Sequence, residues 1–244
     1  MTDHDPIEIK VNIGGDVDRA LTVLDLGEGK ARKVWFLDDV TEGLKEPLPL
    51  LKENIILRLR RRDNGKEDST VKLRPCRRSQ LAGKWAVAPT DDDEYRIEGD
   101  WSRDRHVLAA SCVAELERGT IENALDGSGR IADVFSDRQR EFLADCGHIP
   151  VELGAVTVLG ARAIAAIQWK DDVSVGSVPD VVAERWTLDE LDFLELSIRV
   201  DSGPDDAAAA QRKLHDEVAS QGLEFADTDL PKTLLVMKRL AGLD

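Results

Sequence analysis

The pattern of apolar and polar positions predicts a chain built largely of strands. Residues 6–13 (PIEIKVNI) alternate cleanly, with four β-branched residues on one face and Glu8, Lys10 and Asn12 on the other. The ends of the strands are indicated by glycine, proline or acidic turns. The other segments that we read as strands are 33–37, 55–62, 70–74, 83–88, 95–101, 151–169 (two short strands broken near Gly160) and 193–200.

Other segments predict helices. The apolar spacing in 105–118 predicts one amphipathic face, and a capping box at Ser136 and Gln139 opens a helix over 137–145. We therefore expect a helical region over about 105–147. A C-terminal region over about 205–242 is expected to contain two helices, one at 205–221 and one near 231–242. Residues 184–200 are ambiguous, because residues 187–190 can cap a helix while 194–200 alternate like a strand, and we choose a strand for 193–200.

A local excess of positive charge is concentrated in and just after one predicted hairpin. Residues 54–85 contain ten Lys/Arg and three Asp/Glu, a balance of +7 in a chain whose net charge is −15. Residues 63–66 (DNGK) supply the turn, so Arg58, Arg60 and Arg62 share a face, as do Lys72 and Arg74 on the partner strand. Facing rows of like charge destabilise a sheet unless an anion lies between them.

Two interpretations of this hairpin remain open. One is a binding site for a multiply charged anion. The other is an edge hairpin whose Lys/Arg rows discourage the addition of another strand.

Composition limits the classes of function. The 244 residues allow one large β-rich domain or two small ones, and we see no linker, so we expect a single domain over 1–244. No apolar run approaches a membrane span, and the acidic start MTDHDPIEIK has no signal core, so we expect a cytoplasmic protein without membrane contact. An acidic chain is a poor general nucleic-acid binder, whereas one basic patch suits a compact polyanion. The three cysteines are dispersed and indicate neither a disulfide framework nor a zinc site.

The polar strand faces carry either cations or carboxylates, which suggests a closed barrel with a charged interior. A phosphate chain on the cations and a divalent metal on the acids would give each charge a partner. That arrangement also suits phosphoryl transfer, which needs charge neutralisation and alignment. Neither GxxxxGK[ST] nor GxGxxG occurs, and no Ser–His or Cys–His arrangement suggests covalent catalysis.

The order IEIK, LRLRRR, TVKLRP, RIEGD and FLELS resembles the CYTH family of the triphosphate tunnel metalloenzyme superfamily, over roughly residues 6–200. That superfamily includes class IV adenylate cyclases, thiamine triphosphatases and inorganic triphosphatases. The resemblance implies an α+β fold, a closed antiparallel eight-stranded β-barrel with peripheral α-helices. It also implies a tunnel that binds triphosphate with Mg²⁺ or Mn²⁺.

Site residues follow from the resemblance position by position. Glu8 and Lys10 match the catalytic N-terminal motif. The substrate-binding positions that the resemblance and the hairpin together indicate are Lys10, Arg58, Arg60, Lys72, Arg74, Arg162 and Lys232. The metal-binding positions are Glu8, Glu98, Asp100 and Glu195.

Two departures reduce the carboxylates expected to bind metal, since Pro6 and Ser197 stand where the family has glutamate. The first hypothesis is a metal-dependent phosphohydrolase acting on a triphosphate or polyphosphate small molecule, as a monomer or homodimer. The alternative is a barrel that binds a polyphosphate or nucleotide without turnover. A class IV-type adenylate cyclase ranks last, because nothing in the sequence selects adenine.

Overall fold

The structure is a computed structural model that describes residues 5–40, 47–89, 92, 94–201, 203–227 and 230–243. The chain forms two compact units, which are described separately. The first unit comprises Met1–Arg32, Glu98–Val107 and Ile164–Lys232, and the second comprises Lys33–Ile97, Leu108–Ala163 and Thr233–Asp244. The predicted turn at 91–93 lies mostly outside the described residues.

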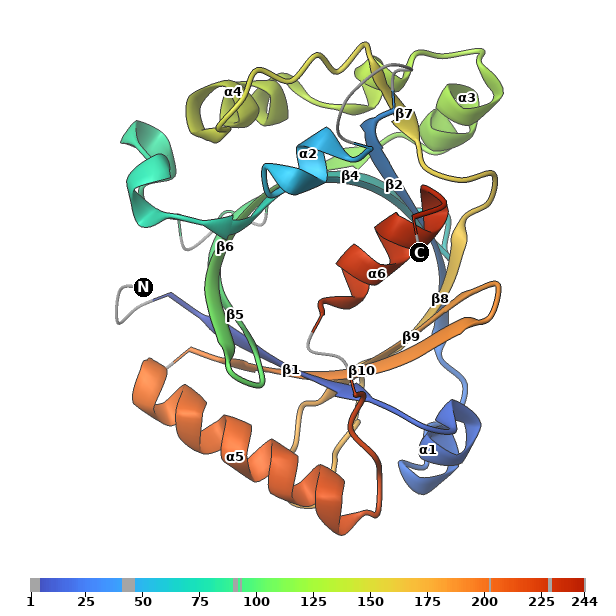
Figure 1. Cartoon of the computed structure of the whole chain (residues 1–244), viewed down its shortest axis with the longest axis vertical. Coiled ribbons are helices and arrows are strands. Elements are labelled where there is room, and N and C mark those ends of the chain that lie inside the picture. The colour runs from blue at the N-terminus through green and yellow to red at the C-terminus, as the bar shows by residue number, and fades with distance from the viewer. Residues whose placement is uncertain are drawn as a thin grey trace. The chain divides into compact units, whose positions relative to one another are not determined.

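The described residues form strands that belong to one sheet, and all the predicted strands except 83–88 are among them. In chain order they are β1 (Ile7–Ile13), β2 (Lys30–Asp39), β3 (Ile55–Arg62), β4 (Glu67–Cys76), β5 (Tyr95–Ser102), β6 (Arg105–Leu116), β7 (Val156–Val158), β8 (Ile164–Trp169), β9 (Val182–Leu188) and β10 (Leu191–Val200). Within the described residues the strand order is β3-β4-β6-β5-β1-β10-β9-β8-β2-β7 (Figure 1). An additional pairing of β3 with β2 closes nine of these strands into a barrel, with β7 attached to β2.

The expected closed α+β barrel is therefore confirmed, but two of its details are wrong. The closed part has nine strands where eight were expected. It is also mixed, because β1 pairs with β5 in parallel, while it pairs with β10 in the antiparallel sense.

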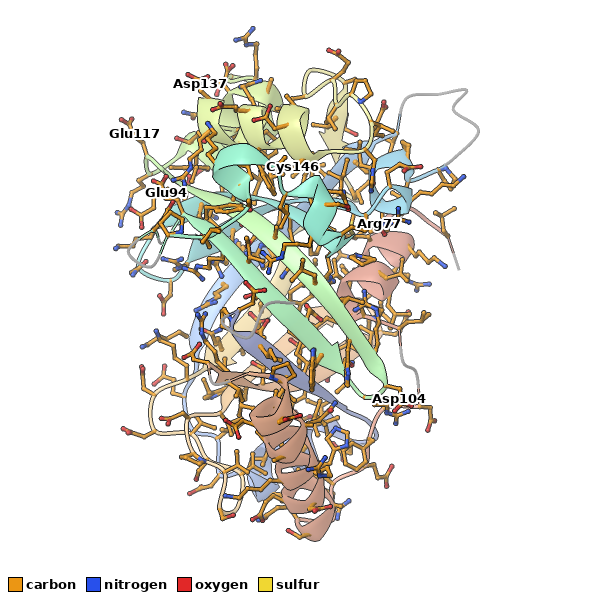
Figure 2. All side chains as sticks on the ribbon, turned by 90° about the vertical axis from the view of Figure 1, so that its left-hand side faces the viewer. Arg77, Glu94, Asp104, Glu117, Asp137 and Cys146 are labelled. Atoms are coloured by element: carbon orange, nitrogen blue, oxygen red, sulfur yellow. The ribbon has the colours of Figure 1, made fainter. Side chains whose placement is uncertain are left out.

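The helices are α1 (Val17–Val23), α2 (Pro49–Lys52), α3 (Thr120–Asp126), α4 (Asp137–Cys146), α5 (Pro204–Ser220) and α6 (Lys232–Leu240), with short 3₁₀ turns at Arg78–Gln80, Gly83–Trp85 and Ile131–Val134. The Ser136 capping box opens α4, whose first and last residues are labelled in Figure 2. The predicted helices at 137–145, 205–221 and 231–242 are thus confirmed. Among the described residues, no helix has the length and apolar character needed to cross a membrane.

The predicted helix at 105–118 is wrong, because these residues form β6. Leu108, Ala110 and Cys112 pack into the core of the second unit, while Ala109 and Ser111 are buried on the opposite face of the strand. A strand that is buried on both faces has a continuous apolar sequence, which periodicity cannot distinguish from a helix. Asp104, labelled in Figure 2, lies in the turn that joins β5 to β6. Within the expected helical region 105–147, the helices therefore begin only at α3, and the first part of that region is strand β6.

Two further local predictions need correction. Residues 83–88 form no strand, since Gly83–Trp85 is a 3₁₀ turn. The ambiguous stretch contains most of β9. Thr187, which could have capped a helix, is the last residue but one of this strand. The β9–β10 connection is a short hairpin in which Asp189 adopts a positive φ of 51°.

In each unit the apolar face of the strands packs into the hydrophobic core. In the second unit Ile55, Leu57 and Leu59 of β3 enter a cluster that also contains residues of α3 and α4. Gln139 of α4, fully buried, donates from Nε2 to the Ser69 carbonyl at 3.0 Å and so ties α4 to β4. In the first unit the four apolar residues of β1 pack with α5. Because side chains alternate along a strand, Lys10 of β1, Arg58 and Arg60 of β3 and Lys72 of β4 lie on the face away from these cores.

Candidate active site: a cationic face and two acid pairs

The second unit carries a strongly basic strand face. In the β3–β4 register Arg58 lies opposite Thr70, Arg60 opposite Asp68, and Ile56 opposite Lys72. Paired residues of an antiparallel ladder point to the same side of the sheet, so the basic side chains of the two strands share one face. We call this the cationic face; its members are Arg58, Arg60, Arg62, Lys72 and Arg74.

The charge on this face differs from the sequence-based picture in one respect. The two basic rows share a face as predicted, but they do not oppose each other directly, because the residues opposite Arg58 and Arg60 are Thr70 and Asp68. The Asp68 carboxylate is 2% exposed, and its Oδ2 accepts from Arg60 Nε at 3.0 Å and from Arg62 Nη2 at 3.1 Å. Arg58 Nη2 donates to Thr70 Oγ1 at 3.2 Å. Five cations thus share the face with one buried carboxylate.

Arg61 shows the contrast between the two faces of β3. It points to the other side of the strand, where its guanidinium lies 5.9 Å from the centre of the Trp35 ring and 3.6 Å from Glu122 Oε2. Arg61 therefore contributes to packing and to a surface ion pair rather than to the cationic face.

The first unit contains an acid pair that converges on Lys10. Lys10 Nζ lies 2.8 Å from Glu8 Oε2 and 2.6 Å from Asp100 Oδ2. The parallel β1–β5 register places Glu8 opposite Asp100, which brings the two carboxylates together. Arg105 lies 3.8 Å from the other oxygen of Asp100. Asp100 is buried, whereas the Glu8 side chain is 34% exposed, so this pair is accessible to water on one side.

A second acid pair lies on β9 and β10, where the register places Glu184 opposite Glu195. Lys232, the first residue of α6, reaches both, with Nζ 2.7 Å from Glu184 Oε2 and 3.0 Å from Glu195 Oε1. The same ammonium lies 4.3 Å from the centre of the Trp186 ring. Burial lowers the pKa of Lys232, but the two carboxylates outweigh this effect and raise the pKa above its ordinary value.

The structure groups the predicted residues in a different way from the sequence. Glu8 and Asp100 are together, but Glu195 pairs with Glu184 and Lys232. The described residues contain no group of three or more His, Cys, Asp or Glu that could hold a metal ion. Glu98 is half-buried on β5, on the same side as Asp100 by alternation.

Arg162 was expected on a strand and lies elsewhere. It is exposed in the loop between β7 and β8, since β8 begins only at Ile164. Its assignment to phosphate binding stays a prediction.

The sequence interpretation missed residues that share these clusters. Asp68 was left between the turn at 63–66 and the second strand, which was expected to begin at Thr70. Arg32 and Glu184 were missed because strand β2 begins earlier than predicted and β9 was not recognised. The strand-favouring residues Val181, Val182, Trp186 and Thr187 were the signal that could have identified β9.

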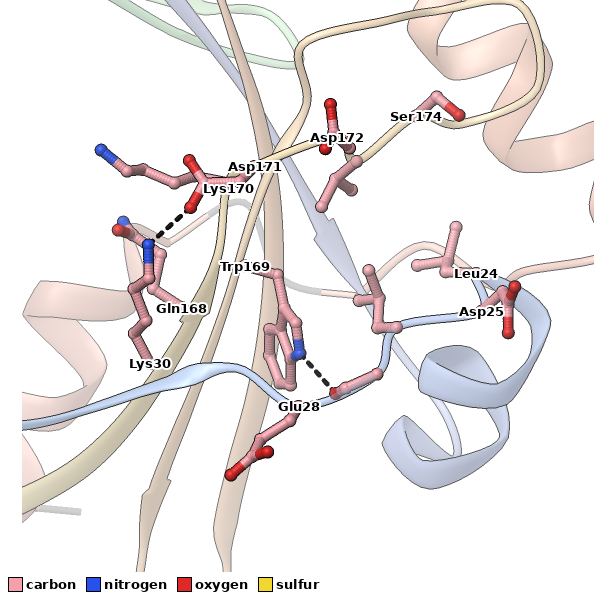
Figure 3. A pocket seen from close by; sticks show the side chains of 13 residues that line it. Leu24, Asp25, Glu28, Lys30, Gln168, Trp169, Lys170, Asp171, Asp172 and Ser174 are labelled. Atoms are coloured by element: carbon pink, nitrogen blue, oxygen red, sulfur yellow. Dashed lines mark hydrogen bonds and ion pairs between the residues drawn. The ribbon is translucent and has the colours of Figure 1, made fainter.

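The first unit also has a pocket of about 310 Å³ between the loop after α1 and the loop after β8 (Figure 3). Trp169 forms part of its wall and donates from Nε1 to the Gly27 carbonyl at 2.8 Å. Lys30 and Asp171 form an ion pair at 2.5 Å that joins the two loops. These contacts hold the loops together, and we assign the pocket no function.

No protein-family model and no curated protein matches the sequence. Solved structures do match. HpAC1 from Hippeastrum, named as an adenylyl cyclase and described as having a dominant triphosphatase activity, superposes with a TM-score of 0.60 at 11% identity, over 94% of each chain. This likeness decides the fold. The chain has the fold of the Hippeastrum protein.

A second solved structure matches more weakly. It is a protein from Vibrio parahaemolyticus named as an adenylate cyclase, with a TM-score of 0.42 at 13% identity, over 96% of this chain and 99% of that one.

Proposed function

We propose that the protein binds the triphosphate group of a small molecule on the cationic face and hydrolyses it. The observation that carries this proposal is the excess of basic side chains there, five against the single buried carboxylate of Asp68. Guanidinium and ammonium groups on a rigid strand pair suit phosphate oxygens, because their hydrogen bonds to anions are charge-assisted. The fold likeness to a protein with triphosphatase activity supports hydrolysis as the reaction.

The first acid pair fits a divalent metal ion. Mg²⁺ is commonly held by one or two carboxylates together with substrate phosphates and water. Glu8 and Asp100 already converge on one cationic atom, Lys10 Nζ, and Glu8 is accessible to water. A bound Mg²⁺ or Mn²⁺ would supply charge neutralisation and a polarised water. In this proposal Glu8 and Asp100 hold the ion, and Lys10 keeps positive charge beside them.

The proposal is tested by phosphate release from inorganic triphosphate, ATP and thiamine triphosphate, with Mg²⁺, with Mn²⁺ and with a chelator. We expect release from at least one substrate that the chelator abolishes. The preferred substrate would identify the type of triphosphatase. The hydrolase proposal fails if no substrate is turned over under any of these conditions.

A second candidate is a barrel that binds triphosphate without turnover. It is favoured by the contacts of the acids, because each pair is closed by a lysine, and by Ser197, which lies opposite Lys10 where a further carboxylate would be expected. In this case triphosphate raises the melting temperature with no phosphate release.

The substitution Ser197→Glu separates the two candidates. Ser197 is buried beside Lys10 and two residues from Glu195, so the new carboxylate would join the face that carries Glu8. If the native chain is a weakened enzyme, we expect metal-dependent phosphate release to rise about tenfold, the effect of one additional ligand. Pro6→Glu is combined with it where the single variant is insufficient. Unchanged release in both variants, with triphosphate binding retained, would favour the binder.

A further inference from the structure

The cluster around Lys232 is complete without a metal ion. Four charged side chains meet there: Arg32 Nη1 lies 3.9 Å from Glu184 Oε1, and Lys232 contacts Glu184 and Glu195. Two carboxylates are therefore matched by two cations. Both basic side chains are nine-tenths buried, and Lys232 is 7% exposed.

Adding a divalent cation to this cluster would leave two positive charges in excess in a site that water barely reaches. A buried charge without a partner is strongly unfavourable, so such an ion could enter only if Lys232 left. Departure of Lys232 is opposed by two short ion pairs and by the Trp186 ring beneath its ammonium. The Glu8–Asp100 pair differs because Glu8 and Arg105 are partly exposed and can rearrange with water.

Lys232 is also the residue at which α6 begins. The last turn of α6 is held independently, since the Leu240 side chain lies against Gly160, close enough that a methyl group added there would meet Leu240 Cδ2 at 2.7 Å. The ion pairs of Lys232 thus define the start of a helix whose other end packs against the segment after β7.

We propose that Lys232 is the resident cation of the Glu184–Glu195 pair, where it excludes divalent metal ions and fixes the start of α6. Glu195 is then not a metal ligand, and Lys232 acts as a positioning residue rather than a phosphate ligand. The inference concerns metal selectivity in the absence of substrate. It therefore stands or falls separately from the proposed hydrolysis.

The test is to count Mn²⁺ bound to the full chain without substrate, by electron paramagnetic resonance, in the native protein and in Lys232→Met. Methionine is unbranched and only one heavy atom shorter than lysine, and it carries no charge. We expect the variant to bind one Mn²⁺ more than the native protein, with an affinity at least about tenfold higher than any native binding at that pair. The additional ion should be lost in the double variant Lys232→Met/Glu195→Gln. Lys238→Met, an exposed position on the same helix, is the matched control and should bind as the native chain does.

A thermal melt provides a second readout. Lys232→Met leaves two buried carboxylates without their ammonium, so its melting temperature should fall in chelator and recover with Mn²⁺ more than that of the native protein. Equal Mn²⁺ binding by Lys232→Met and the native chain would overturn the proposal.

If Lys232→Met does not fold, Glu195→Gln in the native background decides the question. This conservative change keeps a hydrogen-bond acceptor for Lys232. We expect native Mn²⁺ binding to be unchanged by it, and a loss of native Mn²⁺ binding would show that Glu195 is a metal ligand.

Discussion

Replacing Arg58 with methionine should weaken triphosphate binding by about 10- to 100-fold, whereas replacing Arg61 with methionine should leave it unchanged. The two residues lie on the same strand, three positions apart, and differ in the face they occupy. Arg58 lies on the cationic face beside Thr70, and Arg61 packs against Trp35 on the other side. Loss of a charge-assisted hydrogen bond to a phosphate explains the magnitude.

The measurement is isothermal titration calorimetry with inorganic triphosphate, in chelator and then in Mg²⁺. Circular dichroism of both variants checks that the fold is kept. Arg61→Met controls for the general loss of one positive charge from this strand. Equal weakening in the two variants would mean that triphosphate responds to net charge rather than to the cationic face.

Asp68→Asn should lower the free energy of unfolding by about 2–4 kcal/mol, and triphosphate should restore part of it. Asp68 is a buried carboxylate whose Oδ2 accepts from two arginines of the cationic face. Its replacement leaves Arg60 and Arg62 close together without their shared anion. A bound triphosphate supplies negative charge to the same face, so we expect it to stabilise the variant more than the native chain.

Urea unfolding with and without triphosphate measures both effects. Glu115→Gln is the matched control, because Glu115 lies opposite Asp68 on β6 but is exposed, and surface substitutions usually change stability by less than about 0.5 kcal/mol. A destabilised Asp68→Asn protein that triphosphate stabilises no more than the native chain would contradict a shared role of phosphate and Asp68.

The strands with one polar and one apolar face were predictable from the sequence. β1 and β3 alternate because one side packs into a core and the other carries charge, and that alternation is a local property of the chain. β6 was not predictable in this way, since Ala109 and Ser111 on one face and Leu108 and Ala110 on the other are all buried. Periodicity carries no information where both faces are alike.

The sequence predicted which charged side chains of the candidate site share a face of a strand. The shared face of Arg58 and Lys72 follows from the turn at 63–66. The partners of the charges were not predictable, because they are set by contacts between distant segments. The contact between Lys232 and Glu184 joins residues 48 positions apart, and nothing in either local sequence indicates the other.

The central claim is that the cationic face of β3 and β4 holds a triphosphate. A crystal structure of the protein grown with inorganic triphosphate in chelator tests it most directly. We expect phosphate oxygens within hydrogen-bond distance of Arg58, Arg60 and Lys72, with Asp68 still paired to Arg60. Triphosphate bound at another surface, with the cationic face unoccupied, would contradict the account.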